Sequence, residues 1–242
     1  MTSTIVAPES AAQPAGEPET ATSFVEYLFL KVDPLWRRLP AAVREEGRTE
    51  FAGVLRAAER TVTAHAYSTL GLKAGAELLL WWRAERPEAI QETLSALLLT
   101  GLGSYCQVAY TLFGLTRPST YTKRRTAQEQ ALDEPTRLPY LIVYPFVKTT
   151  DWYLLNKDVR QGLMNEHMRI GHEFTDVRQM LVYTTGLDDQ EFVVAYETDR
   201  LARHQELVIA LRATDSRRYT LRDTPIFTAI HRPLDTALAL LG

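Results

Sequence analysis

The chain has 242 residues with a formal net charge of −3; 45% of the residues are hydrophobic and 24% are charged. This length allows one large domain or two small ones with a substantial core, and no basic stripe with interleaved aromatic residues indicates a nucleic-acid binder. The single cysteine, Cys106, excludes an internal disulfide framework and a thiolate metal cluster, so we expect a cytoplasmic protein.

Residues 1–22 are rich in Pro, Ala, Thr and Glu and contain neither Lys nor Arg. A secretory signal needs a basic start and an apolar core, and both are missing, so this segment is predicted to be a flexible tail. The most apolar stretch, IQETLSALLLTGLG, is too short to span a bilayer and is interrupted by glycine. We therefore expect no membrane span.

The first half of the remaining chain alternates between strand and helix patterns. A strand is predicted at residues 24–30, a long amphipathic helix at 39–60, and two strands around a glycine-containing turn at 61–84. Pro87 occupies the favoured first-turn position of a helix that runs to about Leu99, and a fourth strand follows at 104–114.

The second half repeats this order after a polar connector at residues 116–138. A strand is predicted at 140–146, a helix at 158–171, a hairpin at 177–197, a helix at 200–212 and a last strand at 224–230. The two hairpins resemble one another, with YSTLGLKAGAELLLWW in the first half and VYTTGLDDQEFVVAYE in the second. Such self-similarity indicates a duplicated supersecondary unit.

Each unit therefore reads β-α-β-β-α-β, which is the ferredoxin-like arrangement. The predicted fold class is α+β, with ferredoxin-like halves at residues 23–115 and 139–242. Helices cover one face of each antiparallel sheet, so the other face must be buried as well. The simplest solution packs the two sheets against each other into a barrel-like core with the helices outside.

His167 is the first candidate for chemistry, because it interrupts the apolar stripe of a predicted helix formed with Leu155, Val159, Leu163 and Gly171. A histidine on such a stripe is most often a core residue bonded to a carbonyl. The functional alternative is an axial ligand of a haem iron, which needs no second protein ligand. His172 lies five residues further on and does not share its helical face, which argues against a paired-histidine metal site.

Tyr144 and Lys148 come from the end of a strand and the loop after it. The structural reading is an amphipathic tyrosine and a solvated lysine; the functional reading is a phenol that can lose an electron and a proton beside a cation that binds carboxylates. Arg212 and Ser216 follow the last long helix, Asp215 could orient His167 through its far nitrogen, and Tyr121 lies in the connector. Each of these is more often structural when taken alone.

No phosphate-binding loop, calcium-binding loop, dinucleotide fingerprint or Ser-His-Asp arrangement is recognisable. The combination and order of other motifs resemble the chlorite dismutase family, and within it the coproheme decarboxylase branch. The resemblance runs from about Val25 to Leu240. It rests on DPLWRRL, YSTLGLKAGAELLLWW, TGLGSY and GLTRPSTY in the first half, and on YPFVK, DWY, LMNEH, GLDD and TPIFTAI in the second.

This resemblance implies a haem-type porphyrin in the C-terminal half of a homo-oligomer, commonly a pentamer. It assigns His167 in LMNEH as the axial iron ligand, and Tyr144 and Lys148 in YPFVK as the radical-forming tyrosine and the essential lysine. Porphyrin contacts are expected from Tyr121, Trp152, Arg212 and Ser216.

The distal residue over the iron is arginine in chlorite dismutases. Counting back from GLDD gives Gln179 here, whereas counting forward from His167 gives Met180, and a shifted register would turn Arg178 to the haem. Strand alternation allows only one neighbour to meet the iron, and Gln179 is the preferred assignment.

The expected reaction is peroxide-dependent decarboxylation of coproheme (Fe-coproporphyrin III) to haem b. The alternatives are chlorite dismutation, a haem protein without turnover, and a haem-free barrel that binds another small organic ligand.

Overall fold

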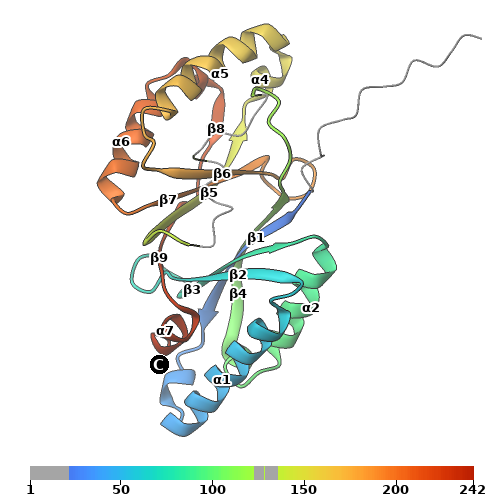
Figure 1. The fold of residues 1–242 in the computed structure, drawn as a ribbon, viewed down its shortest axis with the longest axis vertical. Helices are drawn as coiled ribbons and strands as arrows, with labels where there is room; N and C mark the ends of the chain where they lie inside the picture. Colours follow the sequence, from blue (N-terminus) through green and yellow to red (C-terminus); the bar gives the residue numbers. More distant parts are fainter. Residues whose placement is uncertain (1–21, 123–127, 129–135) are drawn as a thin grey trace, which may run out of the picture.

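The computed structural model describes residues 22–122, 128 and 136–242 (Figure 1). Apart from its last residue, the predicted N-terminal tail lies outside the described residues. Most of the predicted connector also lies outside them. Within the described part of the chain, no helix is long and apolar enough to cross a membrane.

The N-terminal half has every element that its sequence predicts, in the same order. Its elements are β1 (Phe24–Val32), α1 (Ala41–Ala58), β2 (Val62–Ser68), β3 (Leu78–Ala84), α2 (Pro87–Leu98) and β4 (Cys106–Leu115), with 3-10 turns η1 (Trp36–Arg38) and η2 (Gly103–Tyr105). Pro87 lies at the first position of α2, where its missing N–H leaves no helical bond unmade.

The C-terminal half repeats the order and adds short elements that the sequence did not reveal. Its elements are β5 (Tyr140–Lys148), α4 (Thr150–Leu154), α5 (Lys157–Gly171), β6 (Arg178–Tyr183), β7 (Phe192–Thr198), α6 (Leu201–Arg212), η4 (Asp215–Tyr219), β8 (Thr220–Arg222), β9 (Phe227–His231) and α7 (Leu234–Ala239). The last predicted strand begins three residues late, at Phe227, after Pro225, which has no N–H for a ladder.

The two sheets join into one closed barrel. Each half has the ferredoxin-like strand order, β4-β1-β3-β2 and β9-β5-β7-β6, and all the pairings are antiparallel. The halves meet where β4 pairs with β6 and where β2 pairs with β9. These two seams complete a ring, which confirms the predicted antiparallel barrel with helices outside.

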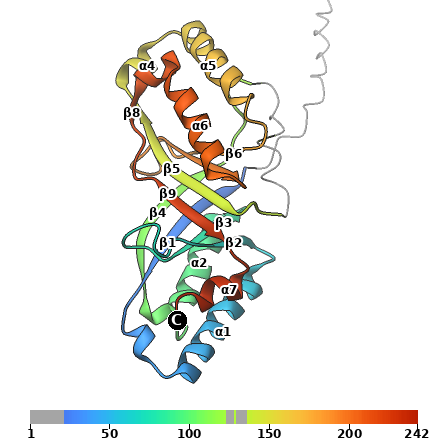
Figure 2. The ribbon, with the colours of Figure 1, turned by 90° about the vertical axis from the view of Figure 1, so that its left-hand side faces the viewer.

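Residues from every strand of the ring fill the barrel interior. The inward-facing positions alternate along each strand, as in β1, where Val25, Tyr27 and Phe29 are all fully buried. Helices α1, α2 and α7 lie on one side of the barrel, and α4, α5 and α6 lie on the other (Figure 1). Figure 2 shows α5 and α6 side by side over the strands of the C-terminal half.

The outer faces of the two sheets are covered differently. Under α1, α2 and α7, the outer face of the N-terminal sheet is filled by a continuous apolar core that includes Trp36, Phe51 and Trp82. Its C-terminal counterpart is smaller and centres on Tyr196 and Leu207. The difference leaves space between α5 and the sheet.

A buried ion cluster fixes the end of the connector to the barrel. The Glu197 carboxylate lies 3.3 Å from Nη1 of Arg137, and both side chains are almost fully buried. The Tyr67 hydroxyl donates to the same carboxylate at 2.9 Å, and Nη1 of Arg178 lies 3.9 Å from it. Nη1 of Arg178 also donates to the Thr136 carbonyl at 2.8 Å. The cluster thus ties residues 136–137 to β6 and β7.

Removing the carboxylate of this cluster is expected to be strongly destabilising. Glu197→Ala would leave buried guanidinium charge without its counter-ion, which typically costs about 3–5 kcal/mol. The free energy of unfolding, measured with urea, should fall by about that amount. Glu206→Ala on α6 is the matched control, because its 2.9 Å pair with Arg203 is exposed and should contribute less than about 1 kcal/mol. Equal, small losses in both variants would contradict the assignment.

Candidate functional site

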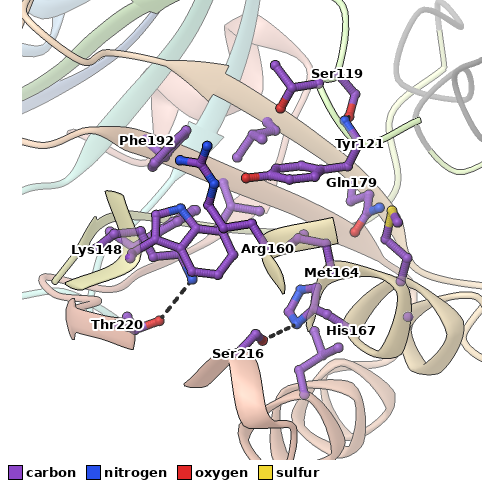
Figure 3. Close-up of a pocket in the computed structure, with 18 of the residues that line it drawn as sticks. Ser119, Tyr121, Lys148, Arg160, Met164, His167, Gln179, Phe192, Ser216 and Thr220 are labelled. Carbon is purple, nitrogen blue, oxygen red and sulfur yellow. Dashed lines mark hydrogen bonds between the residues drawn. The ribbon is translucent and has the colours of Figure 1, made fainter. Parts of the chain in front are cut away.

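A cavity of about 760 Å³ lies between the outer face of the C-terminal sheet and the helices α5 and α6 (Figure 3). Its size falls within the range of roughly 300–1,000 Å³ that is typical for organic cofactors and substrates. Alternate residues of three strands form one wall: Tyr144, Phe146 and Lys148 from β5, Gln179, Leu181 and Tyr183 from β6, and Phe192, Val194 and Tyr196 from β7.

Helix α5 forms the opposite wall, but only His167 and Gly171 of the predicted stripe lie on it. No residue of α5 is buried and Val159 is 44% exposed, whereas His167, Met164 and Arg160 line the cavity. Four-residue steps overshoot a helical turn by about 40° each, so a stripe spaced by four drifts around the helix. Alternating steps of three and four keep one face, and that face carries His167.

His167 is held by a hydrogen bond to one ring nitrogen. The Ser216 hydroxyl lies 3.3 Å from Nδ1 of His167 and 2.9 Å from the Thr214 hydroxyl. Nε2 makes no hydrogen bond to any residue that the structure describes. A ring nitrogen fixed from behind by a polar partner, with the other nitrogen open, is the arrangement of a metal-ligating histidine.

The protonation state of His167 also suits a ligand. Burial, together with the positive charge of nearby Lys148, lowers the pKa of the imidazole to about 4. The ring is therefore neutral near pH 7, as coordination to iron requires.

Ser216 rather than Asp215 contacts His167. The Asp215 carboxylate instead pairs with Arg218 at 3.2 Å, and its backbone N–H donates to Glu166. The predicted orienting role of Asp215 is therefore wrong. Ser216, expected from the family resemblance to bind the porphyrin, is buried with its hydroxyl already shared between two partners.

Tyr144 lines the cavity from β5, next to a second tyrosine, Tyr196, on β7. Their ring centroids are 6.1 Å apart. Burial raises the pKa of the Tyr144 hydroxyl above its ordinary value, so it is a neutral phenol at physiological pH. The sequence analysis did not single out Tyr196.

Lys148 lies at the end of β5 with its ammonium group among aromatic rings. Nζ is 4.5 Å from the ring centroid of Trp152, on α4, and 3.5 Å from Oγ1 of Thr220 (Figure 3). Burial lowers the pKa of Lys148 to about 8, and the nearby positive charge of Arg217 acts in the same direction. Its backbone N–H donates to the Glu191 carboxylate at 2.6 Å. Lys148 is therefore a cation that is easily deprotonated inside the cavity.

Three neighbouring residues of β6, Arg178, Gln179 and Met180, were candidates for the side chain that faces the cavity. Gln179 faces it (Figure 3). Met180 packs its side chain in the barrel interior, where the Tyr27 hydroxyl lies 3.8 Å from its sulfur, and Arg178 approaches Glu197. Positions 178 and 180 share one face, as alternation requires, and Gln179 occupies the other.

The remaining predicted contacts are also brought to this cavity. Arg212 lines it and pairs with Asp223 at 3.2 Å. Tyr121 lines it with its ring centroid 6.4 Å from that of Trp152, and its carbonyl accepts from Gln161 on α5. The predicted connector residue Tyr121 thus belongs to the site.

Arg160 is a cavity cation that the sequence analysis missed. It lies seven residues before His167, which is two helical turns, so both side chains line the cavity from one face of α5 (Figure 3). This spacing was the signal that could have found it. No ion pair holds its guanidinium among the residues described.

The donor set and shape of the cavity fit a haem-type porphyrin. One neutral imidazole is available to iron, and apolar and aromatic walls such as Phe146, Leu181 and Phe192 suit the flat macrocycle. The cations Lys148 and Arg160 suit the carboxylates that a porphyrin carries. By contrast, the described residues contain no group of three or more His, Cys, Asp or Glu that could hold a bare metal ion.

Comparisons with known proteins agree with this geometry. A family model described as chlorite dismutase matches residues 44–232. The chain is 35% identical over 176 residues to the coproheme decarboxylase of Mycolicibacterium smegmatis, which covers 72% of this chain and 75% of that protein. It is 26% identical over 230 residues to the chlorite dismutase of Ideonella dechloratans, covering 90% of this chain and 80% of that protein.

Solved structures show the same fold over nearly the whole chain. Chlorite dismutase from Candidatus Nitrospira defluvii in complex with imidazole matches with a TM-score of 0.83 and 27% identity, covering 93% of this chain and 96% of that one. A double variant of the same protein matches with a TM-score of 0.83 and 28% identity, covering 90% and 94%. The similarity therefore extends across both halves and the cavity.

Proposed function

The chain belongs to the chlorite dismutase family, as the order of its motifs indicated, and we propose that it converts coproheme to haem b by peroxide-dependent oxidative decarboxylation. Bound coproheme would be both the substrate and the centre at which hydrogen peroxide is reduced. For each propionate, R–CH2–CH2–COOH and H2O2 give R–CH=CH2, CO2 and two molecules of water. Two propionates react in turn.

The observation that carries this proposal is the phenol of Tyr144 in the same cavity as His167 and Lys148. Abstracting hydrogen from a saturated propionate carbon requires a strong one-electron oxidant next to that carbon. A neutral tyrosine can give up an electron and a proton and then take a hydrogen atom from the substrate. Dismutation of chlorite has no step that needs such a group.

Other residues of the cavity would bind the substrate. His167 would hold the iron, and Lys148 would attract a propionate and exchange its proton. Further contacts would come from Arg212, Arg160, Tyr121 and Trp152, where charge-assisted hydrogen bonds contribute about 1.5–3 kcal/mol each. Ser216 would serve this site through His167. A substrate with four carboxylates needs several such cations.

Chlorite dismutation is the second candidate, since a chlorite dismutase covers 90% of this chain. Chlorite and the hypochlorite formed from it are anions, and a cation over the iron would hold them. Gln179, which lines the cavity, would take the position over the iron and is neutral, while Arg178 is turned toward Glu197. We therefore expect little oxygen release from chlorite. A haem protein without turnover is the third reading.

The deciding experiment loads the purified protein with ferric coproheme, adds hydrogen peroxide in steps and follows the porphyrin mass. The proposal predicts the successive loss of two carboxyl groups, through a singly decarboxylated intermediate, to haem b. An oxygen electrode with chlorite as substrate is run in parallel. Oxygen release at enzyme-like rates with an unchanged porphyrin would establish the dismutase instead. Neither reaction, despite a normal Soret band, would leave a non-catalytic haem protein.

Coproheme binding is expected to weaken as the pH rises through about 8. The lowered pKa of Lys148 means that the free protein loses this positive charge near pH 8. A bound carboxylate raises that pKa, so affinity is full below pH 8 and falls by up to about tenfold per unit above it. Titrations from pH 6 to 10 should show this slope in the wild type and in Lys31→Met, an exposed control. The affinity of Lys148→Met should not change with pH in this way. If it did, another titrating group would be responsible for the pH dependence.

A homo-oligomer, commonly a pentamer in this family, is part of the same proposal. Light scattering coupled to size-exclusion chromatography would give the mass of the assembly directly. A monomer at micromolar concentration would remove the oligomeric part of the proposal without touching the chemistry.

A further inference from the structure

Two tyrosines lie side by side at the wall of the cavity, Tyr144 and Tyr196. Tyr144 on β5 lies opposite Val194 on β7, so Tyr196 is its diagonal neighbour on the same outer face of the sheet. The ring centroids are 6.1 Å apart and the ring planes are inclined by 32°. The pairing register of β5 and β7 therefore places a second phenol directly beside the proposed redox tyrosine.

The two members of the pair have different surroundings. Tyr196 is 5% exposed and lies beneath α6, where its ring packs 5.0 Å from that of His204 and also contacts the apolar core. Tyr144 is partly exposed and borders the open cavity. Among the described residues, no group outside this pair makes a hydrogen bond to the Tyr196 hydroxyl.

This asymmetry gives one preferred direction to a hydrogen bond between the two hydroxyls. A buried hydroxyl must find an acceptor for its proton, and Tyr196 has only the Tyr144 oxygen. Tyr144 can direct its own proton into the cavity, where substrate groups lie.

Resting on the proposed decarboxylase function, we infer that Tyr196 is a positioning residue for Tyr144. Its hydroxyl donates a hydrogen bond to the Tyr144 oxygen. This bond turns the hydrogen of the Tyr144 hydroxyl toward the substrate. After that hydrogen has left, it turns a free lone pair of the oxygen the same way. Tyr196 itself exchanges no electron or proton with the substrate.

The steps balance without any proton leaving Tyr196. When Tyr144 is oxidised, its electron passes to the peroxide-oxidised coproheme. The proton of its hydroxyl passes to a base in the cavity, either Lys148 in its neutral form or a propionate. The phenoxyl oxygen then takes a hydrogen atom from the propionate carbon and becomes a phenol again. The substrate radical then gives an electron to the oxidised centre. The carbon–carbon bond between the propionate chain and its carboxylate breaks, which releases CO2 and leaves the vinyl group. Throughout, the hydrogen bond from Tyr196 holds the reacting oxygen in one orientation.

Tyr196→Phe tests this role because it keeps the ring that packs under α6 and removes only the hydroxyl. We expect unchanged coproheme affinity and a decarboxylation rate lower by about tenfold, the effect of one hydrogen bond. Tyr140→Phe is the matched control, since Tyr140 lies four residues before Tyr144 on the same face of β5 and outside the cavity. The control should keep the wild-type rate.

A spectroscopic readout separates positioning from a structural role. Freeze-quenched samples in H2O and D2O should show a tyrosyl radical coupled to an exchangeable proton in the wild type and not in Tyr196→Phe. Where the radical is too short-lived, coproheme deuterated at the reacting carbon should slow the variant more strongly than the wild type. A variant with the wild-type rate and either the wild-type proton coupling or the wild-type isotope ratio would overturn the inference. A wild-type protein that leaves coproheme intact would reject the proposed function instead.

Discussion

A Tyr144→Phe variant is expected to bind coproheme like the wild type and to lose nearly all decarboxylation. The substitution keeps an aromatic ring in the cavity wall and removes the group that would exchange hydrogen with the propionate. Loss of such a group typically slows a reaction by roughly 10²–10⁴-fold, so the rate should fall by about 10³-fold. Porphyrin mass after peroxide addition measures the rate, and a Soret titration measures binding.

The size of this effect distinguishes Tyr144 from its neighbour. Tyr196→Phe should be slower by only about tenfold, because it removes one hydrogen bond to the reacting oxygen and not that oxygen. Adding Tyr196→Phe to Tyr144→Phe should cost nothing further, since the hydrogen bond is already gone. A Tyr144→Phe variant that still produced haem b at the wild-type rate would require a different oxidised residue and would remove the basis for both roles.

Much of the fold follows from patterns that are local in sequence. Hydrophobic alternation and glycine turns marked the strands, and two similar hairpins revealed the duplication. Barrel closure followed from one physical requirement: each half would otherwise leave one apolar sheet face in water. The short elements α4, β8 and α7 escaped prediction because three to six residues carry too little periodicity to be recognised.

The site was less accessible to sequence reasoning wherever it depends on pairing between distant segments. Tyr196 meets Tyr144 only because of the register of β5 against β7, which no local pattern encodes. Ser216 meets His167 because η4 packs beside α5, again a tertiary contact. By contrast, Gln179 was expected from the family pattern counted back from the GLDD turn, and it lines the cavity as strand alternation allows.

A cavity also changes how an amphipathic helix should be interpreted. The expectation that His167 lies on an apolar stripe packed on the sheet assumed direct contact between α5 and the strands. In the structure α5 buries no residue, and its inner face mixes Met164 and Met168 with Arg160 and His167. Such a face is too polar to pack on a sheet and too apolar for water. It is suited to an amphipathic ligand with a flat apolar body and charged edges.

His167→Ala is expected to abolish axial imidazole ligation and to weaken coproheme binding by at least about 100-fold. Losing only the outer partner of a metal-binding histidine already costs about 10–100-fold in affinity, so losing the ligand itself should cost more. Cavity contacts such as those from Lys148 and Arg160 would still retain some porphyrin at high concentration. Electron paramagnetic resonance and the Soret position of that complex report the ligation independently of turnover.

Added imidazole and a second histidine make this prediction specific. The space left by the His167 side chain should admit free imidazole, which would restore the ligation spectrum and part of the affinity. His172→Ala is the matched control, because His172 also lines the cavity from the end of α5 but lies five residues on and is exposed. It should retain the imidazole-ligated spectrum. If His172→Ala lost that spectrum while His167→Ala kept it, His172 would be the iron ligand and the iron would lie nearer the end of α5. The position of the substrate relative to Tyr144 would then differ from the one proposed.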